Sequence, residues 1–77
     1  IAQNNYFNDP FKYNYNYSEY GLAFVMCKKY ASAKRIFLEI EADQPNTYVI
    51  AANLGTVYEL LGQTDSALFW LKRAVNL

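Results

Sequence analysis

The chain has 77 residues, of which 53% are hydrophobic and 18% aromatic, and its seven basic and seven acidic residues leave no net charge. This length allows a single domain, and the composition is too apolar for a disordered segment but lacks an apolar run long enough to cross a membrane. The balanced charges also lack the basic clusters that nucleic-acid binding needs.

Residues 1–13 are rich in asparagine and aromatic residues and predict an N-terminal arm or cap. Asp9 is suited to cap a helix that has Pro10 at its first position. Tyrosine and asparagine then alternate over residues 13–17, which alone would indicate a strand, but aromatic residues continue at helical spacing as far as Phe24. We therefore expect helix here, with the arm either folded over the following helices or packed on a partner.

The first helix is expected to run to about Lys28 or Lys29, because these positive charges suit the negative end of the helix dipole. A second helix is expected over about residues 31–42. Its apolar residues are spaced to bury one face. They are Ala33, Ile36, Phe37 and Ile40.

Pro45 breaks the chain, and Asn46 can cap a third helix over about residues 47–61. Gly62 is placed to end that helix as a C-terminal cap glycine. The fourth helix is expected to follow a cap at Thr64 or Asp65. Its predicted apolar stripe consists of Ala67, Leu68, Leu71, Ala74 and Val75. The expected architecture is all-α, with four antiparallel helices in two hairpins.

The two halves of the chain share a pattern of residue sizes at an offset of 34 residues. Gly21 and Gly55 are one such pair, and both lie inside expected helices, where glycine costs roughly 1 kcal/mol against alanine. At the same offset, small residues align with small ones and large apolar residues with large apolar ones. This repeat predicts a stacked helical solenoid, since one hairpin cannot bury its apolar face alone, and such a solenoid has a surface that binds something.

The order of these residues resembles the tetratricopeptide repeat, which has an aromatic residue, an apolar–glycine pair, an aromatic residue, alanine, an aromatic residue and proline at set spacings. The first copy reads Tyr17, Tyr20, Gly21, Phe24, Ala33, Phe37 and Pro45. The second reads Ala51, Leu54, Gly55, Tyr58, Gly62, Ala67, Leu71 and Ala74, and it departs from the pattern at Ala51 and Leu71. The resemblance implies one repeat over residues 14–47 and a second, incomplete at its C-terminal end, over 48–77.

The resemblance implies a right-handed solenoid in which small residues let the two helices of each hairpin touch and larger residues fill the space beside them. These hairpin-packing positions are Gly21, Phe24, Ala33, Phe37, Gly55, Tyr58, Ala67 and Ala74.

The resemblance also implies a non-catalytic scaffold that binds a peptide or helix of a partner protein on a concave face formed by the first helix of each hairpin. The groove positions would be Tyr15, Glu19, Leu22, Met26, Val49, Asn53, Thr56 and Leu60. The clamp that holds a peptide carboxylate in some members is absent, because Ser18 and Leu22 stand where lysine and asparagine would be needed. The alternative is that Val25 and Leu60 are core residues between the hairpins.

Catalysis is not indicated by any motif. The chain has no histidine, which removes histidine-based acid, base and metal chemistry. The acidic residues Glu39, Glu41 and Asp43 are typical of a solvated helix face, and Cys27 lacks a base partner in the sequence, so we expect an inert, partly buried thiol. No catalytic, cofactor or metal site is predicted.

The last helix provides an alternative function in self-association. Four consecutive large apolar residues predict a surface that must be covered, either by the next helix of a longer repeat protein or by a second copy in a homodimer. They are Leu68, Phe69, Trp70 and Leu71. In a two-fold dimer, Trp70 is expected near the centre of the interface.

Overall fold

The computed structural model describes residues 15–77, and these residues form four α-helices without any strand. The helices are α2 (Tyr15–Met26), α3 (Tyr30–Asp43), α4 (Tyr48–Leu60) and α5 (Thr64–Val75). The described part is therefore all-α, as the sequence predicts. The expected arm over residues 1–13 and the helix start at Asp9 lie outside the described residues.

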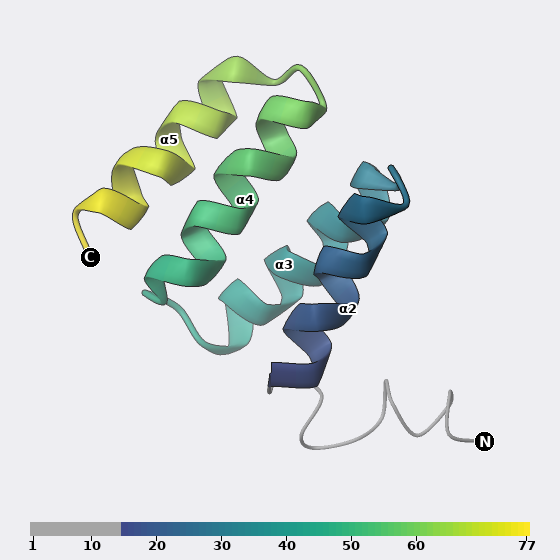
Figure 1. Cartoon of the computed structure of the whole chain (residues 1–77). Coiled ribbons are helices and arrows are strands. Elements are labelled where there is room, and N and C mark those ends of the chain that lie inside the picture. The colour runs from purple at the N-terminus through teal and green to yellow at the C-terminus, as the bar shows by residue number, and fades with distance from the viewer. Residues whose placement is uncertain (1–14) are drawn as a thin grey trace.

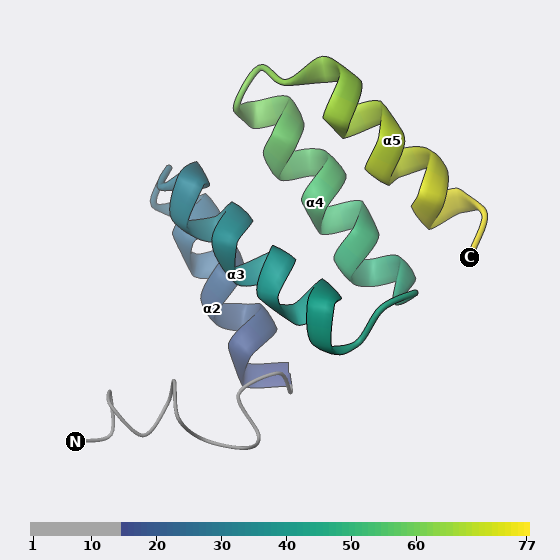
Figure 2. The ribbon, with the colours of Figure 1, turned by 180° about the vertical axis from the view of Figure 1, so that it is seen from behind.

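The helices pack in chain order, with α2 on α3, α3 on α4 and α4 on α5. Successive helices run in opposite directions, and α2 and α5 lie at the two ends of the row (Figures 1 and 2). The inner helices α3 and α4 therefore have a neighbour on each side. The core follows from this, because most fully buried side chains come from α3 and α4.

The helix α2 ends at Met26, earlier than its basic residues suggest. Lys28 has a left-handed backbone with φ of 62°. Its N–H donates to the carbonyl of Val25 at 2.9 Å, and the N–H of Lys29 donates to the carbonyl of Phe24 at 2.8 Å. These two bonds are those of a Schellman motif, which satisfies the last carbonyls and turns the chain out of the helix. The expectation that α2 continues to Lys28 or Lys29 is therefore wrong.

The end of α4 has the same backbone one repeat later. Gly62 has φ of 79° and donates to the carbonyl of Glu59 at 2.9 Å, while Gln63 donates to that of Tyr58 at 2.9 Å. The prediction that Gly62 ends this helix is confirmed. Each residue of the motif lies 34 positions after its counterpart at the end of α2, so the repeat extends from residue sizes to backbone conformation.

The two turns differ in that one places lysine and the other glycine at the left-handed position, which gives a testable difference. Lys28→Gly should raise the free energy of unfolding by about 1 kcal/mol, because glycine adopts this backbone without the Cβ clash. Gly62→Ala should lower the free energy of unfolding by a similar amount. A Cβ built at Gly62 meets nothing within 4 Å, so this variant isolates the backbone cost. Urea unfolding followed by circular dichroism measures both, and a loss of stability in Lys28→Gly would contradict the assignment.

The predicted N-caps are wrong. The N-cap residues of α4 and α5 are Thr47 and Gln63, and neither makes a side-chain capping bond. Thr64 and Asp65 lie in the first turn of α5 instead, where Asp65 still suits the positive end of the helix dipole. Asn46 has φ of 68°, and its side-chain oxygen accepts a hydrogen bond from Arg73 rather than from the start of α4.

Close approach of side chains explains both mid-helix glycines. A Cβ on Gly21 would lie 2.8 Å from Cζ of Phe37, and one on Gly55 would lie 2.6 Å from Cγ of Leu71. Phe37 and Leu71 are themselves 34 residues apart, so each copy places a large side chain of its second helix against a glycine of its first. Both glycines are buried.

Candidate functional site

The repeat pairs each position with a counterpart, and the burial of the two members separates the positions into three groups. The first group lies inside each hairpin and is buried in both copies. Gly21 and Gly55 belong to it, as do Ala33 and Ala67. Because a hairpin's own two helices cover these positions, they give no information about partners.

The second group is buried only where another hairpin is present. Ile36 and Ile40 on α3 are at most 2% exposed, whereas their counterparts Trp70 and Ala74 on α5 are only partly buried. The helix α3 packs on both α2 and α4, and α5 packs on α4. The difference in burial therefore follows from the neighbours of each helix.

The first helices show the converse difference. Leu54 and Val57 on α4 are at most 1% exposed. Their counterparts on α2 are less covered, since Tyr20 is partly buried and Ala23 is exposed. These positions of α4 are covered because α3 precedes it, whereas α2 is the first helix in the described part of the chain.

The third group is exposed in both copies, and we call it the first-helix stripe. It recurs at i, i+4, i+7 and i+11, which places its members on one side of each helix. On α2 the stripe consists of Tyr15, Glu19, Leu22 and Met26. On α4 it consists of Val49, Asn53, Thr56 and Leu60. These are the groove positions that the resemblance implies, although the side chain of Tyr15 lies outside the described part.

Apolar side chains of the stripe are exposed to solvent. Met26 is 83% exposed, Leu60 45%, Val49 44% and Leu22 36%. Glu19 and Thr56 are also exposed and Asn53 is half-buried. The alternative that Val25 and Leu60 are core residues applies to Val25, which packs partly against the core, but not to Leu60.

The last helix presents a different set of exposed residues from the one expected. Leu68 and Phe69 are exposed, but Trp70 packs against the core and Leu71 covers Gly55. Val75, which the sequence assigns to the buried stripe of this helix, is 85% exposed. An open hollow of about 260 Å³ lies beside Leu71 and Val75. The exposed apolar side of α5 therefore differs from the run of four consecutive residues.

Two of the acidic residues expected on a solvated face make structural contacts instead. Tyr17 is buried and its hydroxyl donates to Glu39. Arg73 on α5 lies 3.7 Å from Glu41 and donates to Asn46 at 2.8 Å, and its guanidinium lies 5.9 Å from the centre of the Trp70 ring. Arg73 thus connects α5 to the junction between α3 and α4. The sequence gives no signal for this cluster, because its members come from three separate segments.

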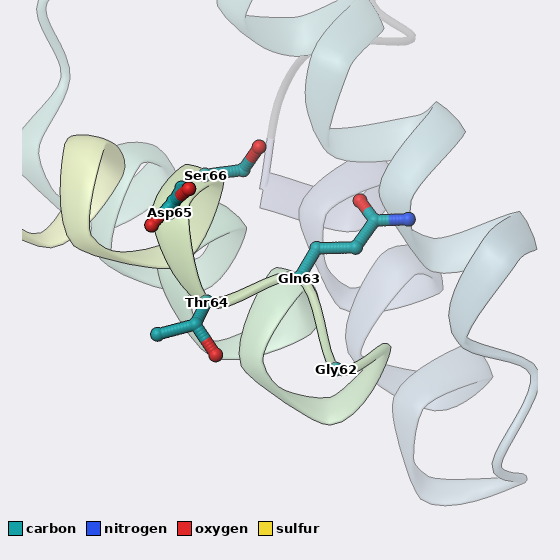
Figure 3. Close-up of a pocket in the computed structure, with 5 residues that line it drawn as sticks. All are labelled: Gly62, Gln63, Thr64, Asp65 and Ser66. Atoms are coloured by element: carbon teal, nitrogen blue, oxygen red, sulfur yellow. The ribbon is translucent and has the colours of Figure 1, made fainter.

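The described residues bring together no catalytic arrangement. No group of three or more histidine, cysteine or acidic residues in the range 15–77 could hold a metal ion. Cys27 is exposed rather than partly buried, because it lies in the turn after α2. A hollow of about 400 Å³ lies over the turn before α5, but the side chains of Gln63, Thr64 and Asp65 point in different directions around it (Figure 3).

Within the described residues, no helix has the length and apolar character that crossing a bilayer requires. Comparisons with protein-family models, with curated proteins and with solved structures gave no significant match. The function is therefore inferred from the repeat and from its exposed surfaces.

Proposed function

We propose that this chain is a non-catalytic protein-interaction module whose first-helix stripe binds a peptide or helix of a partner protein. The observation that carries the proposal is the exposure of Leu22, Met26 and Leu60 in the same register of two repeated helices. Neither the hairpins nor the contact between them requires apolar residues at these positions. Exposed apolar positions that recur in this way are typical of a binding surface.

The resemblance to tetratricopeptide repeats supports the proposal and adds a finer arrangement to it. In that arrangement the hairpins form a right-handed solenoid, and α2 and α4 line its concave face. The recurrence of hydrogen bonds at the ends of α2 and α4 agrees with such stacking of equivalent units.

The chemistry of the stripe defines the class of ligand. Leu22, Met26, Val49 and Leu60 offer apolar contacts, and a flexible methionine adapts to irregular apolar partners. Thr56 donates its hydroxyl to the carbonyl of Ala52, so its exposed methyl group is available for contact. No stripe position carries a positive charge. These features favour an amphipathic helix or an extended apolar peptide over a free terminal carboxylate.

A pull-down with the double variant Leu22→Glu, Leu60→Glu tests the proposal. The new charges should weaken capture of specific partners by more than about tenfold, because apolar anchors contribute much of the affinity at such surfaces. The double variant Ala31→Glu, Ala42→Glu adds the same charge at exposed positions of α3 and should retain the partners. Circular dichroism should show the helices intact in both. Retention of the same partners by the stripe variant would exclude the groove assignment.

A further inference from the structure

The contact between the hairpins is repeated, half by half, on the two ends of the molecule. Within the chain, this contact is made by α3 on one side and α4 on the other. The counterpart of α3 is α5, and the counterpart of α4 is α2. These two helices lie at opposite ends of the row (Figures 1 and 2). Each end therefore carries one half of an interface that the chain already forms internally.

The α5 half is more apolar than its model on α3. Lys34 on α3 faces α4, since its ammonium nitrogen lies 5.6 Å from the centre of the Tyr58 ring. The counterpart of Lys34 is Leu68, which is 49% exposed. Similarly, Glu41 is replaced by Val75. The second copy thus places apolar side chains where the first copy uses charged ones, and this favours a covered rather than a solvated surface.

The α2 half supplies aromatic surface in the matching register. Phe24 is the counterpart of Tyr58, and its ring lies 5.2 Å from that of Tyr20. Tyr20 and Ala23 occupy the positions at which Leu54 and Val57 are covered by α3. The register that places Lys34 over Tyr58 within the chain would place Leu68 of one copy on Phe24 of another.

We propose that the chain associates head to tail with a second copy, with α5 of one copy docking on α2 of the next as α3 docks on α4. Such a contact is heterologous and leaves one free α5 and one free α2, so copies add in a row instead of closing as a two-fold dimer. The first-helix stripe takes no part in this contact, so the proposal is independent of partner binding there.

Light scattering on the full chain and two matched variants tests the proposal. The double variant Leu68→Lys, Val75→Glu gives α5 the residues that α3 has at the same positions, and Ala23→Arg adds a charge to the α2 half. We expect the average mass of the unmodified chain to rise with concentration beyond that of a dimer. Each variant alone should remain monomeric. An equimolar mixture of the two should form a one-to-one dimer, because each retains the half that the other lacks.

Three outcomes would overturn the proposal. One is a monomeric unmodified chain at high micromolar concentration. Another is a dimer that Ala23→Arg leaves unchanged, which would indicate a two-fold contact through α5. The third is failure of the mixed variants to associate. The stripe variant Leu22→Glu, Leu60→Glu should associate as the unmodified chain does, which separates this result from the test of partner binding.

Discussion

Phe37→Ala should lower the free energy of unfolding by about 3–5 kcal/mol, because it removes a fully buried aromatic ring from a close-packed core. The ring is 0% exposed and lies against the backbone of Gly21 on the neighbouring helix. A loss of this size is a large share of the stability of a small domain. Thermal and urea unfolding followed by far-ultraviolet circular dichroism should show a variant that is mostly unfolded or melts far below the unmodified chain.

Phe69→Ala is the matched control for this prediction. Its ring is 58% exposed, so its removal should change the free energy of unfolding by no more than about 0.5 kcal/mol. Equal losses in the two variants would contradict the burial of Phe37 and with it the arrangement of α2 on α3.

Gly21→Ala should lower the free energy of unfolding by about 1–3 kcal/mol, although alanine is the better helix former. The added methyl group would lie 2.8 Å from Cζ and 2.9 Å from Cε1 of Phe37. The ring is fully buried, so it has little room to move away. Denaturant unfolding measures the change, and a gain in stability would show that α2 and α3 do not approach closely here.

A double-mutant cycle with Phe37→Leu identifies the cause of that loss. Leucine lacks the two ring atoms that the new methyl group would meet, so Gly21→Ala should cost much less in this background. The same loss of stability in both backgrounds would contradict a steric contact between the two residues.

The overall fold could be predicted from the sequence because it depends on periodic patterns. Apolar spacing predicts the four helices, and the offset between Gly21 and Gly55 predicts their repetition. The end of α2 could not be predicted in this way. Lysine has no preference for the left-handed backbone that Lys28 adopts, whereas Gly62 does indicate the same turn one repeat later.

The exposed side of α5 could not be predicted from α5 alone. Trp70 and Val75 both fit an apolar helix face, and which of them is covered depends on where α4 lies. Comparison of the two copies position by position does provide a signal. The replacement of Lys34 by Leu68 and of Glu41 by Val75 identifies the side of α5 that differs from its counterpart.

A nuclear Overhauser spectrum of the purified chain tests most directly whether its two halves are copies of one packed hairpin. We expect cross-peaks from the Hα protons of Gly21 to the ring of Phe37 and from those of Gly55 to the methyl groups of Leu71. A strong cross-peak within Lys28 between its amide and Hα protons should report the positive φ that it shares with Gly62. Cross-peaks in one half without their counterparts in the other would contradict the repeat on which both proposed surfaces depend.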